Sequence, residues 1–337
     1  MGPFHGRPDP GRPFSCPSGT NPGPLFPVHL GLVLTMVFWG SAFVTSKMIV
    51  FEVPPDVGAV LRFGLGAILM MGILFRRSAQ PFPPREVWGR IAVVGIVGVT
   101  AFNTCFFHGL ALAPASDAAM IIPAISPVFT AAAGILFLGE PARFHRVAGL
   151  AISLVGAILF FWGVIAHTSG QSTRLFGDLF LLGAAASWAG YSILSRPLLM
   201  KIGPLPATAW SMLLGSLLLL LLSLPRLEGV PWTGLSVKFW LVLAYLVIFP
   251  TVIAYLLWME GIRAIGSGPA TSFMFLAPVS ALLLAAMLLG ERPTLLQGAG
   301  AGSCCSASGG STGVEGENGE CDKRRAYRLT TVPGPVS

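Results

Sequence analysis

The stretch Leu136-Phe137-Leu138-Gly139-Glu140 closes a long apolar run with the pair Gly-Glu, and Met287-Leu288-Leu289-Gly290-Glu291 repeats this ending 151 positions later. Other segments recur at nearly the same distance. At offsets of 151 or 149, the correspondences are Ser126-Pro127 with Ala277-Pro278, Gly149 with Gly300, and Trp39 with Trp188. Self-similarity at a fixed distance indicates that one structural unit occurs twice in the chain.

The composition places both copies in a membrane. Of 337 residues, 54% are hydrophobic and only 10% are charged, and the mean hydropathy is +0.76. A water-soluble domain carries about 25% charged residues, so this chain is predicted to be an integral membrane protein. Duplicated units in such a protein are typical of secondary transporters.

Nine apolar segments are long enough to cross a bilayer as helices, which need about 20 residues each. Helices are expected because the segments exceed strand length and lack two-residue alternation. The predicted spans are 30–50, 57–75, 88–110, 116–138, 147–165, 176–194, 206–224, 239–260 and 268–289.

The formal charge of +7 follows membrane topology and predicts no nucleic-acid partner. Lys and Arg residues concentrate in alternate loops, namely at Arg76, Arg77, Arg85, Arg90, Arg143, Arg146, Arg196, Lys201 and Arg263. By the positive-inside rule, the amino terminus is cytoplasmic and the loop with Glu52 and Asp56 is external. A multi-pass protein of the plasma membrane is expected.

The motifs of the first copy are Phe38-Trp39-Gly40-Ser41-Ala42-Phe43, Lys47, Leu61-Arg62-Phe63, Ser126-Pro127 and Gly139-Glu140-Pro141. The second copy has Trp188, Arg196 in place of Lys47, Tyr255 with Trp258, Pro278 and Gly290-Glu291. In this order the motifs resemble the EamA-type transporters of the drug/metabolite transporter superfamily. The resemblance implies an all-α membrane protein with two repeats of five transmembrane helices. It also implies export of small metabolites, such as amino acids or related amphiphilic solutes.

An odd number of helices per repeat makes the second repeat enter the membrane from the opposite side, so the repeats should be inverted. Alternating access around a site between the repeats is the expected mechanism. The predicted units are a disordered tail (1–27), a first repeat (28–166), a second repeat with four recognisable spans (175–300) and an aberrant polar tail (301–337).

The chain departs from the family pattern after Gly300, where Ala301-Gly302-Ser303-Cys304-Cys305-Ser306 replaces an apolar segment. A tenth helix is therefore absent from the predicted spans. A frameshift explains the change, because leucine codons read one base late can give Cys-Cys-Ser. A divergent tail is the other reading, and a truncated remnant without transport activity is the alternative function.

Residues estimated to lie at similar depth in the helices predict a cavity of aromatic faces with scattered polar groups, suited to amphiphilic solutes. The candidates are Trp39, Ser41, Thr45, Asn103, Phe106, His108, Trp188, Tyr191, Thr251 and Tyr255. The alternative is that the aromatic residues anchor helix ends at the membrane interface and the hydroxyls bond the preceding helical turn.

Lys47 and Arg62 are predicted at the outer mouth, where each either pairs with Glu52 and Asp56 or attracts a substrate carboxylate. His108 is either a proton-responsive group or a packed, hydrogen-bonded histidine. No acidic residue is expected near the middle of a span, which argues against a proton relay through a buried carboxylate.

Enzyme and cofactor functions find no support in the sequence. There is no His-Glu-x-x-His motif, and five cysteines at Cys16, Cys105, Cys304, Cys305 and Cys321 lack metal-ligand spacing. We therefore expect no catalytic residue, metal or cofactor, and no ring of charged positions suggests a channel. The expected partners are a small-molecule substrate and the lipid bilayer, and assembly as a homodimer is left open.

Overall fold

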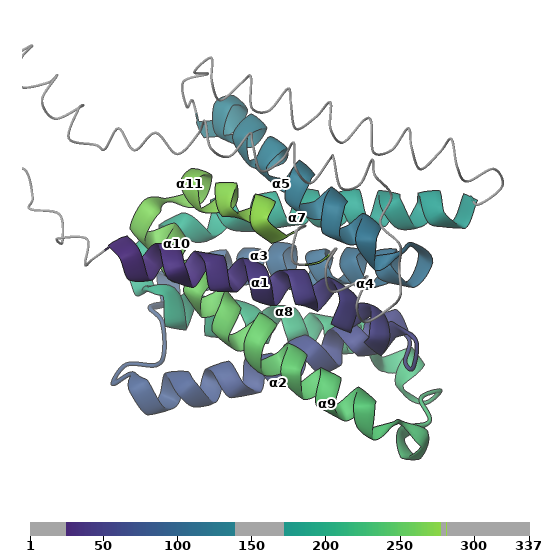
Figure 1. Cartoon of the computed structure of the whole chain (residues 1–337). Helices are drawn as coiled ribbons and strands as arrows, with labels where there is room; N and C mark the ends of the chain where they lie inside the picture. Colours follow the sequence, from purple (N-terminus) through teal and green to yellow (C-terminus); the bar gives the residue numbers. More distant parts are fainter. Residues whose placement is uncertain (1–24, 139–171, 278–280, 282–337) are drawn as a thin grey trace, which may run out of the picture.

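A computed structural model of the chain describes residues 25–138, 172–277 and 281, and every regular element in those ranges is helical (Figure 1). The first half contains α1 (Leu25–Val50), α2 (Pro55–Arg77), η1 (Arg85–Val87), α3 (Trp88–Gly95), η2 (Ile96–Ala101), α4 (Phe102–Leu112) and α5 (Ala115–Leu138). The second half contains α7 (Ser172–Ile202), α8 (Pro204–Leu227), η3 (Trp232–Gly234), α9 (Val237–Leu246), η4 (Val247–Ile253), α10 (Ala254–Ile265), α11 (Ser267–Ser272) and η5 (Phe273–Leu276).

Proline and glycine set several helix boundaries. Pro55 and Pro204 begin α2 and α8, where a residue without a backbone N–H costs no helical hydrogen bond. Gly203 and Gly266 adopt positive φ angles of 81° and 86°, so the chain turns sharply between helices there. At the start of α9, the Ser236 hydroxyl accepts a hydrogen bond from the amide of Phe239.

Six described helices are long and apolar enough to cross a membrane. They are Phe26–Val50, Pro55–Arg77, Arg85–Leu112, Ala115–Leu136, Pro204–Leu227 and Val237–Ile265. Each overlaps a predicted span. α7 is a 31-residue helix that extends beyond the predicted sixth span at both ends, through Pro197 to Ile202. The structure also begins α1 at Leu25, ahead of the predicted Leu30.

Several predictions concern residues outside the described part of the chain. These are the tail before Leu25, the span 147–165, most of the span 268–289, the Gly-Glu pairs at Glu140 and Glu291, and everything after Gly300.

Two helices contain a π-helical segment in the middle. η2 joins α3 to α4, and η4 joins α9 to α10. η2 begins at Ile96 and η4 at Val247, which is again a distance of 151 positions. Pro250 lies inside η4, and because proline has no N–H to donate it favours a local change in the helical hydrogen-bond pattern.

Contacts between the two halves come in matching pairs. α2 packs against α8, α1 packs on α10, and α4 packs on α7. Likewise η4 contacts α2 while η2 contacts α8, and η5 contacts α1 while α5 contacts α7. These pairs match if α1, α2, η2, α4 and α5 of the first half correspond to α7, α8, η4, α10 and η5 of the second. Each of these contacts between the halves then has a counterpart, and the contact of α2 with α8 is its own counterpart.

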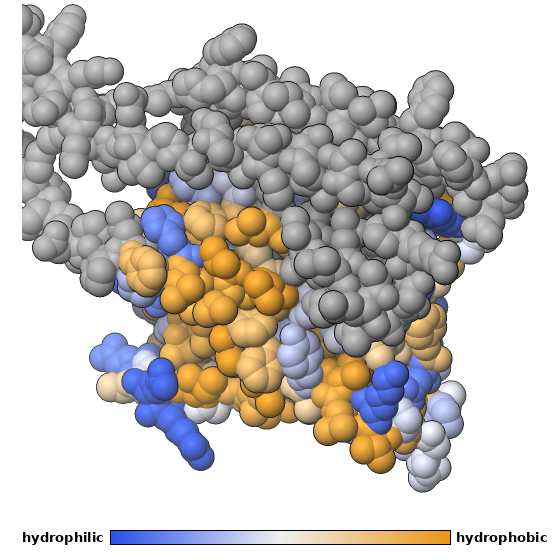
Figure 2. Space-filling model, viewed as in Figure 1, coloured by the Kyte–Doolittle hydropathy of each residue, from blue (hydrophilic) through white to orange (hydrophobic). Residues whose placement is uncertain are grey.

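The surface between the helix ends is apolar. Figure 2 shows hydrophobic residues across the middle of the visible face and polar residues towards its two sides. Large side chains such as Ile68, Leu221 and Leu241 are more than 60% exposed. Such a continuous apolar exterior indicates contact with lipid, since soluble monomers rarely expose one of this extent.

Candidate functional site

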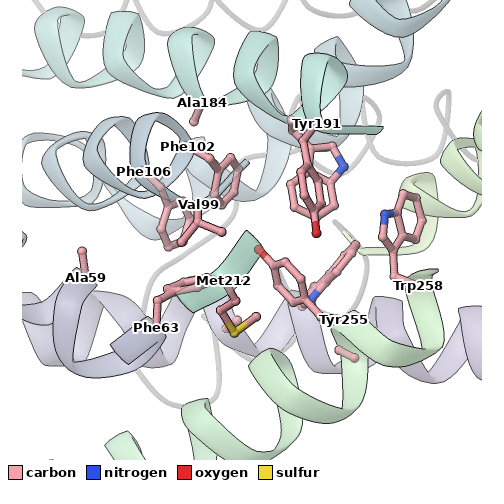
Figure 3. Packing of buried hydrophobic residues seen from close by; sticks show 14 of the residues in the cluster. Ala59, Phe63, Val99, Phe102, Phe106, Ala184, Tyr191, Met212, Tyr255 and Trp258 are labelled. Carbon is pink, nitrogen blue, oxygen red and sulfur yellow. The ribbon is translucent and has the colours of Figure 1, made fainter. Parts of the chain in front are cut away.

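The largest buried aromatic side chains gather in the centre of the bundle. Trp39 of α1 and Trp188 of α7 meet edge to face with ring centroids 4.9 Å apart. Tyr255 and Trp258 of α10 lie 5.8 and 5.1 Å from Trp39, and each lies 5.8 Å from Trp188. We call these four residues the central aromatic cluster. Figure 3 shows Tyr255 and Trp258 on α10 facing Tyr191 on α7.

Aromatic side chains of α2 and α4 extend the cluster. Phe102 stacks on Phe106 at 5.6 Å and contacts Trp188 at 5.2 Å. Phe63 lies 5.8 Å from Tyr255. Tyr191 contacts Trp188 at 5.4 Å, and its ring lies directly on Gly98 of η2, where any side chain would occupy the same space.

Three polar atoms in this apolar centre have no hydrogen-bond partner among the described residues. They are the indole nitrogens of Trp188 and Trp258 and the amide oxygen of Asn103. Asn103 uses its amide nitrogen to donate to the carbonyl of Val99 at 2.7 Å. A buried polar group without a partner costs about 1–3 kcal/mol, so each such group in a native protein calls for a specific explanation, such as a functional role or a bound water or ion.

Arg62 lies inside the bundle, where only 4% of its surface is exposed. Its Nε donates to the hydroxyl of Thr251 at 3.0 Å and its Nη1 donates to the hydroxyl of Ser46 at 3.1 Å. The guanidinium also lies over the Phe63 ring at 5.0 Å. The hydrogen bonds of Arg62 described here therefore go to hydroxyls of two neighbouring helices, and its place at the outer mouth stays a prediction.

Lys47 lies where α4 ends. Its Nζ donates to the carbonyl oxygens of Leu110 and Ala113, which have no helical partner of their own. The lysine thus caps α4 and joins it to the end of α1.

His108 also lies towards this end, away from the central aromatic cluster. Its Nδ1 lies 2.8 Å from the carbonyl oxygen of Thr104, and its Nε2 lies 3.5 Å from Asp56. Asp56 also accepts from Arg226 at 2.6 Å. His108 is therefore hydrogen-bonded within α4 and lies beside a carboxylate of α2.

The small hydroxyl candidates on α1 bond locally. Thr45 donates to the carbonyl of Ser41 at 2.8 Å, which is the preceding-turn bond described above. Ser41 contacts the hydroxyl of Tyr245 at 2.6 Å and donates to Phe38. Of the ten predicted cavity residues, the structure joins Trp39, Trp188, Tyr191 and Tyr255 in one network of ring contacts. Among the described residues, Phe106 reaches this network only through Phe102.

Two buried carboxylates escaped the sequence analysis. Asp117 at the start of α5 and Asp178 near the start of α7 are both 0% exposed. Arg174 binds Asp117 through two hydrogen bonds of 2.7 and 2.9 Å. The available signal was an Asp within each apolar segment, close to its first turn. Within the described residues, no group of three or more His, Cys, Asp or Glu side chains could hold a metal ion.

Comparison with known proteins assigns a family to this arrangement. The sequence matches the EamA-like transporter family over residues 27–162 and again over 175–309. The "Probable amino-acid metabolite efflux pump" of Salmonella typhimurium is 30% identical over 279 residues, covering 80% of this chain and 89% of that protein. The "Uncharacterized transporter YyaM" of Bacillus subtilis is 28% identical over 262 residues, covering 76% and 84%.

Two further similarities agree with this family. The "Probable terminal-alkyne amino-acid exporter" of Streptantibioticus cattleyicolor is 28% identical, covering 78% of this chain and 85% of that protein. One crystal structure has a TM-score of 0.66 at 21% identity, covering 85% of this chain and 97% of that one, which shows the fold alone. Two matched blocks, six apolar helices and relatives named as transporters lead to one conclusion: the chain is a multi-pass membrane protein of the EamA-like transporter family.

Proposed function

We propose that this protein exports small amphiphilic solutes, amino acids or their close derivatives, by alternating access between two inverted repeats. The observation that carries the proposal is the contact of Trp39 with Trp188 at 4.9 Å. These residues occupy corresponding positions in the two copies. Corresponding residues can touch only close to the axis that relates the copies, so the central aromatic cluster lies where a carrier of this architecture holds its substrate.

The paired helix contacts support the inverted arrangement. In Figure 1, α1 runs from left to right and α7 from right to left, although each is the first described helix of its half. Opposite directions for corresponding helices are what five spans per repeat require. The residues after Gly300, where that scheme would have a tenth helix, lie outside the described part of the chain.

The chemistry of the centre favours a zwitterionic solute with an apolar or aromatic side chain. Aromatic faces contact such a side chain, the unpartnered indole N–H groups donate to a carboxylate, and the Asn103 oxygen accepts from an amino group. The buried guanidinium of Arg62 adds a positive charge beside Phe63 and Phe106. Two of the relatives are named as amino-acid exporters or efflux pumps.

Flux in proteoliposomes tests the proposal. Vesicles loaded with a mixture of the standard amino acids should release a subset faster with the protein than without it, and Trp188→Ala should abolish that release. Trp240→Ala is the matched control, because Trp240 is 45% exposed on α9, outside the central aromatic cluster. A second preparation replaces the residues after Gly300 with an apolar span. No release by either preparation would contradict transport, and release by the second alone would favour the remnant.

Orientation in the plasma membrane has a separate test. We propose that the loop carrying Glu52 faces outward and the loop carrying Arg85 faces the cytoplasm. In a cysteine-free background, Glu52→Cys should react with a membrane-impermeant maleimide on intact cells, whereas Arg85→Cys should react only after lysis. The opposite result would reverse the topology.

A further inference from the structure

Three ionisable side chains meet where α5 and α7 begin. Asp117 is fully buried and accepts both hydrogen bonds of the Arg174 guanidinium, which is 21% exposed. Asp178 lies one helical turn after Arg174 and is also fully buried. Arg174 directs its donors to Asp117 and leaves the second carboxyl without a hydrogen bond.

Close helix packing buries Asp178. Its neighbour Gly177 lies against the end of α4, where an added Cβ would come within 2.8 Å of the Ala113 side chain. Because α7 can approach α4 so closely at this glycine, the next residue is enclosed between helices. The burial of Asp178 is thus a consequence of the helix contact.

Both oxygens of Asp178 are without a hydrogen-bond partner among the described residues, and its carboxyl lies beside the carboxyl of Asp117. Two ionised carboxylates have no proton with which to form a hydrogen bond to each other, and their like charges repel. A buried, unpaired carboxylate is also expensive in free energy. Two carboxyls in contact resolve both problems by sharing one proton, which one donates to the other.

We propose that Asp117 and Asp178 form a proton-binding site at the contact of α5 and α7. The proton resides on Asp178, which donates to Asp117, while Arg174 neutralises the charge that remains on Asp117. Binding adds one proton to the pair and release returns it to water, so no other reactant is needed.

Other charged groups at this end of the bundle make contacts of their own. From α1, Lys47 caps the carbonyls of α4. From α4, His108 faces Asp56 of α2, and Asp56 is also bound by Arg226 of α8. We place the proton site on Asp117, Arg174 and Asp178.

The pair also joins the two halves of the chain, since α5 belongs to the first matched block and α7 to the second. Resting on the export function proposed above, we infer that the site exchanges one proton against the solute. A change in the packing of α5 on α7 would open the pair to one side of the membrane, and the proton would then leave or enter there.

Infrared spectroscopy of the purified full-length protein tests the site without any substrate. At about pH 6, well above the range near pH 4 in which exposed carboxyls ionise, a protonated-carboxyl band should persist and should disappear in Asp178→Asn. Glu86→Gln is the control, because Glu86 pairs with Lys201 on the surface. An identical band in the wild type and in both Asp178→Asn and Asp117→Asn would overturn the proposal.

Stability distinguishes a protonated Asp178 from an ionised one. Asparagine is an uncharged isostere that still donates a hydrogen bond to Asp117, so Asp178→Asn should fold and melt like the wild type. If Asp178→Asn fails to fold while Asp178→Glu folds, the position requires a negative charge and the proposal is wrong.

A separate experiment tests whether proton movement is coupled to solute transport. With a pH-sensitive dye inside proteoliposomes, external amino acids should drive proton movement through the wild type, whereas Asp178→Asn should give no dye signal. If wild-type protein moves amino acids without protons, the coupling fails. If it moves no solute, the export function fails while the infrared result on the pair still stands.

Discussion

The indole nitrogen of Trp39 donates a 3.0 Å hydrogen bond to the carbonyl oxygen of Pro250. This bond joins α1 of the first half to the π-helical segment η4 of the second half, more than two hundred positions away. It fixes the orientation of the tryptophan whose ring contacts Trp188, so the central aromatic cluster is tied to the irregular backbone of η4.

Replacing Trp39 with phenylalanine tests this bond, because the substitution keeps an aromatic ring and removes the donor. Loss of one buried hydrogen bond costs about 0.5–1.5 kcal/mol, so a modest decrease in melting temperature is expected. The decrease in solute release should be larger than the stability change alone explains. Trp240→Phe on the lipid-facing surface should change neither the melting temperature nor the solute release. If both substitutions reduce release equally, the hydrogen bond of Trp39 is not required for transport.

Arg62 should tolerate no exchange for lysine. A lysine Nζ is a single point donor and cannot reach Thr251 and Ser46 with the geometry of a guanidinium, and it also loses the flat face over Phe63. We expect Arg62→Lys to reduce solute release at least tenfold in proteoliposomes. Arg76→Lys, at an exposed position near the end of α2, is the comparison. Full activity of Arg62→Lys would show that charge alone suffices.

Gly98→Ala should move Tyr191 out of the central region. A Cβ at this position would lie only 1.9 Å from the Tyr191 ring, so either the ring or the contact of η2 with α7 must give way. Destabilisation by about 1–3 kcal/mol and loss of release are expected. Gly72→Ala on α2, where nothing lies within 4 Å, should leave both unchanged. Thermal denaturation and flux together report the two effects.

The ion pairs differ in burial and should differ in strength. A double-mutant cycle on Asp117 and Arg174, whose carboxylate is fully buried, should give a coupling free energy of about 1.5–3 kcal/mol. The same cycle on Glu86 and Lys201, which are 77% and 46% exposed, should give less than about 1 kcal/mol. Equal coupling in the two cycles would contradict the assignment of Asp117 and Arg174 as a buried link between α5 and α7.

The positions of most helices could be predicted from the sequence because lipid imposes a simple rule. A helix must be apolar over about 20 residues, and Gly, Pro and charged residues interrupt that pattern where helices end. The length of α7 was underestimated because polar residues lie near its two ends, such as Arg174, which pairs with Asp117, and Lys201, which pairs with Glu86. The pattern measures contact with lipid and carries no information on these ion pairs.

The aromatic part of the candidate site could also be predicted, since the duplication marks Trp39 and Trp188 as equivalent and large rings fill the space between helices. The polar part could not. Arg62 near the start of α2 reads as a surface residue, and only the fold shows that Thr251 lies beside it. Asp117 and Asp178 lie 61 positions apart and become neighbours through the packing of α5 on α7.

The π segments η2 and η4 bear on the history of the chain. A π turn holds one more residue than an α turn needs, so each segment records an additional residue accommodated within a helix. Both begin at corresponding positions of the two copies. One event in the ancestral gene, before it was copied and fused, accounts for both, whereas separate insertions would have to strike the same site twice. This parsimony favours an irregularity that is older than the two-copy protein that now contains it.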